Sequence, residues 1–141
     1  ALKEMADAGL VAEVLKNLGL GEAAKRGVGT SDNQLPDMSL FSSSLSQMSG
    51  WQKLPSGMMI QYSKAGSTSS EKLISYPVAF PHAVLSVTFG CRQSSFPTMG
   101  QSVVIDDSTV NRFGFTCRAL AFDQSTMVDS SSNFFWMAIG Y

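Results

Sequence analysis

Few residues in this sequence could carry out catalysis. His82, in the segment FPHAV, is the single histidine among 141 residues. One histidine is too few for a histidine-rich metal site and leaves a Ser-His-Asp triad a single possible general base. No G-x-S-x-G segment presents a serine nucleophile. We expect His82 to lie in a loop or at a sheet edge, and we expect no covalent hydrolase chemistry, no bound metal and no cofactor.

Four aspartates are candidates for acid–base chemistry on a glycosidic bond, which requires a pair of carboxyl groups. They are Asp106, Asp107, Asp123 and Asp129. Each lies in or beside a turn rich in Ser, Thr or Gln, where aspartate commonly caps the backbone or forms an Asx turn. The turn role is the preferred interpretation. We therefore expect a protein that is not an enzyme, with a glycan depolymerase using paired aspartates as the alternative.

Three loops expected to be exposed carry the candidate binding groups: KAGSTSSEK, RQSSFPTMGQ and DQSTMVDSSSN. Loops on a rigid β scaffold often do the binding. Amide, guanidinium and carboxylate groups can hydrogen-bond sugar hydroxyls or phosphates, and an aromatic ring offers a stacking face. Taken as a set, the candidate receptor-binding residues are Arg92, Gln93, Phe96, Asp106, Asp107, Arg112, Asp123 and Gln124.

Short β-type runs must position these loops. From residue 58 onward such runs alternate with turn clusters, a pattern typical of an all-β sandwich or barrel. Pro77 and Pro81 bracket VAF and remove backbone donors, so that segment should bend or lie on an edge. The expected strands cover 58–64, 72–80, 83–92, 101–106, 112–123 and 133–141.

The segment RFGFTCRALAF alternates most clearly. One strand face carries Phe113, Phe115, Cys117, Ala119 and Ala121, and the other carries Arg112, Gly114, Thr116, Arg118, Leu120 and Phe122. Since successive side chains of a strand point to opposite faces, and neither of these faces is purely polar, we expect packing on both sides. The segment is predicted to be a central strand or a subunit contact.

The two cysteines, Cys91 and Cys117, lack a C-x-x-C spacing, so a structural zinc site is not expected. They could form a disulfide if neighbouring strands bring them together. Buried free thiols are the preferred interpretation, because unpaired cysteine is among the most buried residue types.

The N-terminal part has a different pattern. Residues 2–18 carry apolar side chains at helical spacing, Gly19 is placed to cap the helix, and Glu22 to Arg26 could add one more turn. Isolated helices of this length are marginal in water, so the stripe needs a partner. Residues 31–49, rich in Ser, Asp, Asn, Gln and Pro, are typical of a linker. We therefore expect a helical arm over 1–30, a linker over 31–49 and a β domain over 50–141.

The overall charge limits the partners. A net charge of −1, without clustered Lys and Arg, gives no footprint for nucleic acid or anionic lipid. No apolar run approaches the ~20 residues that a membrane span requires. We expect a soluble protein with no nucleic-acid partner and no membrane insertion. Its surface, rich in Ser, Thr, Gln and Asn, is more typical of an extracellular or virion surface than of a cytosolic enzyme.

Four phrases of the sequence resemble the C-terminal receptor-binding part of contractile-phage tail fibres. LGLGEAAKRGVGTSDNQLPDMSLF resembles the helix, Gly-rich link and N-Q-(I/L)-P-D-M spacer of these fibres. GWQKLPSGMMIQYSK, YPVAFPHAVLSVTFG and the closing FFWMAIGY resemble the tip that ends them. The resemblance covers nearly the whole chain and is closest to the tail fibre of phage Mu and its relatives.

This resemblance implies a homotrimeric fibre whose last domain is an antiparallel β-sandwich at the distal tip, preceded by a short helical arm and a linker. It implies host attachment by binding lipopolysaccharide of Gram-negative bacteria. It also implies a tail fibre assembly chaperone that contacts the C-terminal end, and hence a place in the host cytoplasm during assembly and at the distal end of the virion tail fibre afterwards. A purely structural trimerisation tip is a further alternative.

The resemblance also assigns scaffold positions. The framework motif maps onto Gly50, Trp51, Gln52, Lys53, Leu54, Pro55, Gly57 and Gln61, and the closing motif onto Phe134, Phe135, Trp136, Ala138, Gly140 and Tyr141. NFFWMAIGY is accordingly expected to be a last strand whose aromatic faces bury in the domain or at a trimer interface. Gly140 would let another part of the backbone approach closely.

Overall fold

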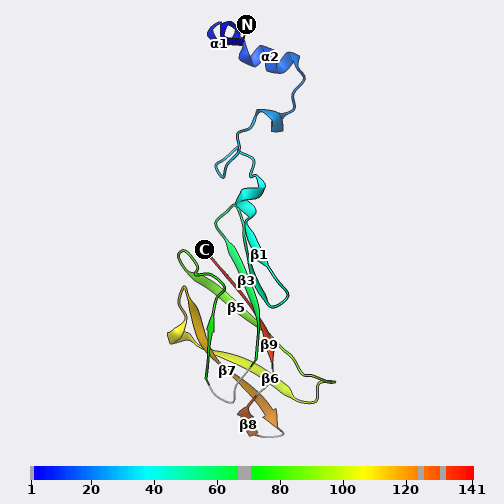
Figure 1. Ribbon diagram of the computed structural model, residues 1–141, viewed down its shortest axis with the longest axis vertical. Coiled ribbons are helices and arrows are strands. Elements are labelled where there is room, and N and C mark those ends of the chain that lie inside the picture. Colours follow the sequence, from blue (N-terminus) through cyan, green and yellow to red (C-terminus); the bar gives the residue numbers. More distant parts are fainter. Residues whose placement is uncertain (1, 67–70, 124–125, 131–132) are drawn as a thin grey trace. The chain divides into compact units, whose positions relative to one another are not determined.

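The structure is a computed structural model that describes residues 2–66, 71–123, 126–130 and 133–141 (Figure 1). The chain divides into two compact units, Ala1–Ser39 and Leu40–Tyr141. The helices are α1 (Leu2–Asp7), α2 (Val11–Asn17), η1 (Glu22–Lys25), η2 (Met38–Phe41) and η3 (Asp107–Thr109). The strands are β1 (Ser43–Leu45), β2 (Ser49–Lys53), β3 (Met59–Ala65), β4 (Lys72–Ser75), β5 (Val84–Cys91), β6 (Gly100–Asp106), β7 (Gly114–Asp123), β8 (Thr126–Asp129) and β9 (Phe134–Gly140).

The first unit contains short helices that bury none of their residues. Gly9, at a φ of 71° that favours glycine, separates α1 from α2, so the expected single helix is two helices. Gly19 follows α2 with a φ of 65°, and its N–H donates to the carbonyl of Lys16 at 3.0 Å, as expected for a cap. The expected further turn is the 3₁₀ helix η1.

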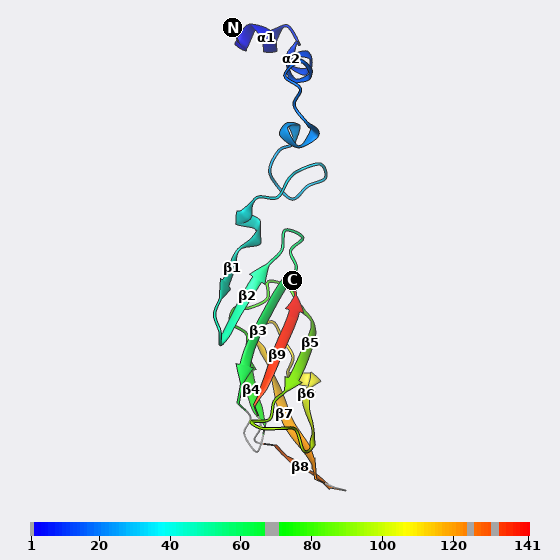
Figure 2. The same cartoon turned by 90° about the vertical axis from the view of Figure 1, so that its right-hand side faces the viewer.

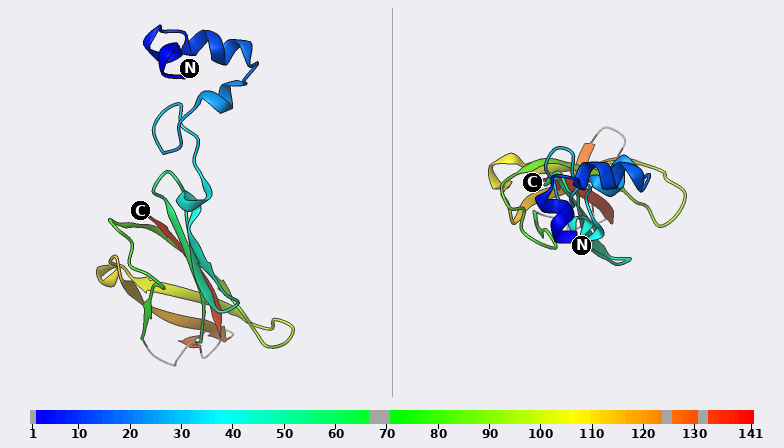
Figure 3. Two further views of the ribbon diagram at one scale, coloured as in Figure 1. Left: turned by 45° about the horizontal axis from the view of Figure 1, so that its top comes forward. Right: turned by 90° about the horizontal axis from the view of Figure 1, so that it is seen from above.

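The second unit is a β-sandwich of two antiparallel sheets, and the expected mainly β fold class is confirmed. Five strands form one sheet in the order β1-β2-β3-β9-β5, and β4-β7-β6 form the other, in which β8 also pairs with β7. Figure 2 shows β9, in red, between β3 and β5. In the left view of Figure 3, β6 and β7 form a layer separate from β3 and β9.

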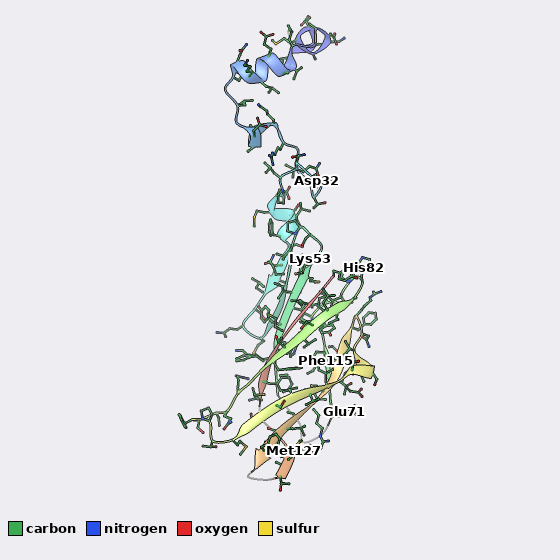
Figure 4. All side chains as sticks on the ribbon, turned by 180° about the vertical axis from the view of Figure 1, so that it is seen from behind. Asp32, Lys53, Glu71, His82, Phe115 and Met127 are labelled. Atoms are coloured by element: carbon green, nitrogen blue, oxygen red, sulfur yellow. The ribbon has the colours of Figure 1, made fainter. Side chains whose placement is uncertain are left out.

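Aromatic side chains from both sheets meet in the core. The Phe115 ring of β7 makes edge contacts with Trp136 of β9 and Phe89 of β5, at centroid distances of 6.0 and 5.9 Å. Tyr76 lies 5.0 Å from Phe80 and 5.7 Å from Trp136. Figure 4 shows Phe115 in the interior of the sandwich. Burial of these large side chains supplies most of the driving force for joining the sheets.

β7 confirms the expected central strand. It pairs with β6 along one side, and with β4 and then β8 along the other. Phe115, Cys117, Ala119 and Ala121 are buried, whereas Arg118 and Phe122 on the opposite face are exposed, so the expected packing on both sides of the strand is wrong. Phe113 differs, since it precedes the strand and is 64% exposed. Its N–H donates to the Asn111 side chain in the turn, at 2.8 Å, so the alternation begins only after that turn.

β9 confirms the expected last strand. Phe134, Trp136 and Ala138 face the core, at most 2% exposed, while Phe135 and Met137 face outward. A Cβ atom at Gly140 would lie 2.3 Å from the carbonyl oxygen of Ala83. The expected close approach of the backbone at Gly140 is therefore present.

Several expectations are corrected by the structure. Within the expected linker 31–49, residues from Leu40 belong to the second unit and include β1, whose three residues are all exposed and thus lack the alternation that marks a strand. The expected loop around residue 127 contains β8, which pairs with the end of β7 although its four residues are exposed. The expected strand 72–80 ends at Ser75, because the segment between the prolines bends as predicted.

The cysteines are both free, so the disulfide alternative is wrong. Cys117 is buried as expected, whereas Cys91 is exposed because it ends β5 at the edge of the core. Burial raises the pKa of both thiols, and the nearby Lys72 charge partly offsets this increase of the pKa at Cys117.

Candidate functional site

The sandwich has two ends with different contents. At one, called the base end, Leu40 to Ser42 lead into β1, next to Lys53 of β2, whose N–H donates to the Ser42 carbonyl at 2.9 Å. The opposite end, called the loop end, carries the β1–β2 turn (46–48) and the β5–β6 loop (92–99). Figure 4 places Lys53 and His82 toward the base end, and Glu71 and Met127 toward the loop end.

Three of the predicted receptor-binding residues lie in or beside the turn between β6 and β7, at the opposite end of β6 from the β5–β6 loop. Asp106 ends β6. Its carboxylate accepts hydrogen bonds from the N–H and the hydroxyl of Ser108, at 3.1 and 2.6 Å, and so caps the start of η3. Asp107 belongs to η3 itself. Arg112 donates from Nε to the Phe80 carbonyl at 3.0 Å. Asp106 and Arg112 therefore hold turns of the scaffold, as the turn interpretation expects for Asp106.

Four of the others lie at the loop end. Phe96 is 86% exposed in the β5–β6 loop, and Gln93 fixes that loop by donating to the Met99 carbonyl at 2.9 Å and accepting from the Thr98 N–H at 3.2 Å. Arg92 directly follows β5, and Asp123 ends β7. Gln124 lies outside the described residues.

The predicted set is therefore divided between two places. β6 is seven residues long and runs from Gly100, beside the β5–β6 loop, to Asp106. This length corresponds to about 20 Å at the rise of an extended strand. A single shallow contact cannot include Phe96 and Asp106 together. Of these two places, the loop end is the one opposite to Leu40, where the chain enters the second unit.

A cluster of two cations and one ring lies on the outer face of the five-stranded sheet at the loop end. The Arg92 guanidinium carbon stacks 4.3 Å from the Phe135 ring centroid, and the Lys64 ammonium lies 5.9 Å from it. Lys64 and Gly90 flank Phe135 on the neighbouring strands. Such cation–π contacts hold long side chains in place. We call Lys64, Arg92 and Phe135 the cation–aromatic cluster.

A hollow of about 480 Å³ adjoins this cluster. Its floor comes from β3, β9 and β5, and Gln47 of the β1–β2 turn forms part of its wall. That turn is fixed to β3, since the Tyr62 hydroxyl donates to the Ser46 carbonyl at 2.7 Å and the Lys64 N–H donates to the Met48 carbonyl at 2.9 Å. The hollow is thus preformed and lies within the size range of small-ligand sites.

Two other hollows are present. One, of about 550 Å³, lies along β6 and β7 and contains the ion pair between Arg118 and Asp129, in which Arg118 Nε also donates to the carboxylate at 2.6 Å. The other, of about 500 Å³ at the base end, includes His82 and Tyr141. His82 is an exposed loop residue, as expected. In the first of these hollows Arg118 and Asp129 are paired with each other and Asp106 caps η3, so these three groups offer less to a ligand.

Among the residues that the structure describes, no three of His, Cys, Asp or Glu lie together as a metal site would require. None of the described helices is both long and apolar enough to cross a membrane.

The sequence interpretation missed Lys64 and assigned Phe135 to the scaffold. The signal was the period of two: in 59–65 and in 134–140, Lys64 and Phe135 stand on the face opposite to the buried residues. Their pairing across β3 and β9 required the register, which a single sequence does not supply.

The family model described as "Putative tail fiber protein gp53-like, C-terminal" matches residues 53–141. The fold is similar to that of an N-truncated R2-type pyocin tail fiber (TM-score 0.57, 16% identity, 93% of this chain and 43% of that chain). It is equally similar to the C-terminal part of the P. aeruginosa R2 pyocin fiber (TM-score 0.57, 16% identity, 93% and 29%).

A third similar structure is the C-terminal part of the P. aeruginosa R1 pyocin fiber (TM-score 0.51, 20% identity, 93% of this chain and 31% of that chain). The chain spans less than half the length of the two R2 fibre chains. No curated protein matches it.

Proposed function

Because the chain belongs to the family of gp53-like tail fibre C-terminal parts, we propose that it is the receptor-binding tip of a phage tail fibre and attaches to lipopolysaccharide glycan on Gram-negative bacteria. The family places it in the distal tail of a virion. The observation that carries the attachment role is the loop end, where Phe96 is 86% exposed and stands on a loop that Gln93 holds in shape. An ordered loop with an exposed ring suits shallow contact with a sugar.

The proposed tip works without cleaving its receptor. Asp106 is occupied as the cap of η3, and Asp129 pairs with Arg118. These two of the four aspartates considered for a depolymerase thus have local structural roles. This supports an adhesin, for which weak identical sites gain by effective concentration on a dense glycan.

We further propose that the tip acts as a homotrimer. In the first unit, Leu2, Val11 and Leu18 remain 49–82% exposed although they lie on or beside short helices. Helices of six and seven residues are unstable alone in water, so identical stripes on sister chains are suitable partners. A dedicated assembly chaperone in the host cytoplasm, in contact with the C-terminal end, would cover the apolar surface of the tip until three chains meet.

The test is retention of the purified chain on immobilised lipopolysaccharides from several Gram-negative strains, with light scattering to establish the mass and analysis of the glycan for cleavage. We expect strain-selective retention of uncut glycan by a species of three chains. Cleaved glycan would support the depolymerase instead. No retention by a verified trimer would leave only a structural role.

A further inference from the structure

The hollow beside the cation–aromatic cluster has two positively charged side chains next to it that form no ion pair with a described residue. None of the carboxylates in the described part of the chain forms an ion pair with Lys64 or Arg92. The ion pairs among the described residues join Lys25 to Glu22 and Arg118 to Asp129. Both cations instead contact one ring, Phe135. Two positive groups at one ring without a counter-ion attract an anion from outside the described part of the chain.

Arg92 lies beside the hollow and not in its lining, but it contacts Phe135, which does line the hollow. Its guanidinium stacks on Phe135, and its Nε is buried without a hydrogen-bond partner in the described structure. A buried donor without a partner is rare and costly. A stacked guanidinium presents its N–H groups in a fixed plane, which matches the paired oxygens of a carboxylate or phosphate.

The floor of the hollow suits a sugar ring. Phe135 is 43% exposed and Met137 is 47% exposed, so both side chains offer apolar surface to a ligand. Gly90, on the neighbouring strand, leaves space beside Phe135: a Cβ atom there would make only ordinary contacts, at 3.9 Å. Polar groups of Gln47 and Thr88 also line the hollow and can bond hydroxyls.

We propose that this hollow binds an acidic saccharide unit, with the carboxylate or phosphate bound by Arg92 and Lys64 and the sugar ring lying over Phe135 and Met137. The inference rests on the proposed receptor function, because it names the chemical class of the glycan unit that is recognised. It also moves the receptor contact from the loop tip alone to the adjoining face of the five-stranded sheet.

The test is titration of the full chain with glucose 1-phosphate, glucuronic acid, glucose or inorganic phosphate. Calorimetry or saturation-transfer NMR measures the binding of each compound. Lys64→Gln and Arg92→Gln remove one charge each. Gly90→Val fills the hollow without a backbone clash and suits a strand. Lys53→Gln is the matched control, because Lys53 contacts the Trp51 ring at 5.6 Å on the same sheet but at the base end.

We expect the two acidic sugars to bind and glucose not to. Each charge variant should weaken acidic-sugar binding about tenfold, as expected for loss of one charge-assisted hydrogen bond. Gly90→Val should abolish binding and Lys53→Gln should leave it unchanged, with unfolding temperatures close to that of the unchanged protein. Absence of acidic-sugar binding, or equal binding in all variants, would overturn the inference. Inorganic phosphate binding as tightly as the sugars would overturn the saccharide part.

Two parallel measurements separate this inference from the proposed function. If the unchanged protein adsorbs to bacteria but Gly90→Val adsorbs equally well, the receptor function stands and this site is wrong. If acidic sugars bind in the hollow but no bacterium is adsorbed, the site stands and the receptor function fails. A smaller mass of Gly90→Val in light scattering would identify the hollow as a contact between copies and overturn the inference.

Discussion

Ala83 and Tyr141 exchange two backbone hydrogen bonds, with N···O distances of 2.8 and 2.9 Å. The His82 N–H also donates to the Tyr141 carbonyl, at 2.7 Å. These bonds draw the end of β9 against the segment before β5, where Gly140 is surrounded by the Ala83 carbonyl and the Phe80 ring. This contact fixes the C-terminal end of β9, while the rest of the strand pairs with β3 and β5.

Gly140→Ala should therefore destabilise the domain by about 1–3 kcal/mol, the usual cost of overpacking. The new Cβ would lie 2.3 Å from the Ala83 oxygen and 2.7 Å from a ring carbon of Phe80. Chemical denaturation measures the effect. Gly100→Ala is the control, because a Cβ there meets no atom within 4 Å; equal stability of the two variants would refute the steric argument.

Gln61→Leu should destabilise the domain by about 2–4 kcal/mol, because it leaves the N–H and carbonyl of the half-buried Val78 without their hydrogen bonds. Gln61 is fully buried, donates to the Val78 carbonyl at 2.8 Å and accepts from the Val78 N–H at 3.0 Å. Urea denaturation checks this. Gln47→Leu, at an exposed turn, should change stability little, and a similar loss in both variants would contradict the assigned role.

Tyr76→Phe should stabilise the domain by about 1 kcal/mol at neutral pH, because the Tyr76 hydroxyl is buried without a hydrogen-bond partner among the described residues. Retained ring packing with Phe80 and Trp136 keeps the core filled. A drop in the unfolding temperature of the variant would show that the hydroxyl has a partner after all.

The same residue predicts a dependence on alkaline pH. Burial raises the pKa of Tyr76 to about 12, against about 10 in an unfolded chain. Above pH 10 the unfolded state loses this proton while the folded state keeps it, so the free energy of unfolding falls until about pH 12. The stability advantage of Tyr76→Phe over the unchanged protein should grow by about 2 kcal/mol between pH 9 and 12, and a constant difference would exclude this linkage.

The two thiols should react at very different rates. A thiol reagent should label Cys91, which is exposed, in the folded protein, whereas Cys117, which is 2% exposed, should react only after unfolding. Mass spectrometry after timed labelling measures both. Cys91→Ser should remove the fast phase; labelling of Cys117 at the same rate would mean that the core opens readily.

Phe96→Ala should lower adsorption to receptive bacteria at least about tenfold, the size of an interface hot spot, while the unfolding temperature stays unchanged. Phe96 is 86% exposed, so its removal leaves no cavity. A cell-binding titration provides the measurement. Phe113→Ala removes an exposed ring beside the start of β7, at the opposite end of that strand from Asp123. This variant is the control and should adsorb normally.

Alternation was a good guide where a strand buries one face. Residues 114–121 and 134–140 were placed correctly because large apolar side chains there recur every second position. β1 and β8 were not recognised, since their residues are all exposed and only pairing with a neighbour makes them strands. Hydrogen bonding between backbones does not by itself produce an alternation of polar and apolar side chains.

The candidate site was predicted less well, for a related reason. Sequence pointed correctly to the β5–β6 loop as exposed, but it grouped Phe96 with Asp106, which lie at opposite ends of β6. Phe96 and Asp106 are close in the sequence, but the length of β6 separates them in the structure. The pairing of Lys64 with Phe135 joins residues from distant strands, and only the sheet order brings them together.

β9 lies between β3 and β5, although it follows both in the sequence. While the polypeptide leaves the ribosome, the β2–β3 hairpin can therefore form early, but β5 has no attachment to that sheet until residues 134–140 have been translated. A product of premature termination before residue 134 lacks Phe134 and Trp136 and leaves two sheet edges open. A chain that ends before residue 134 therefore cannot complete the five-stranded sheet, even when all of its other strands are present.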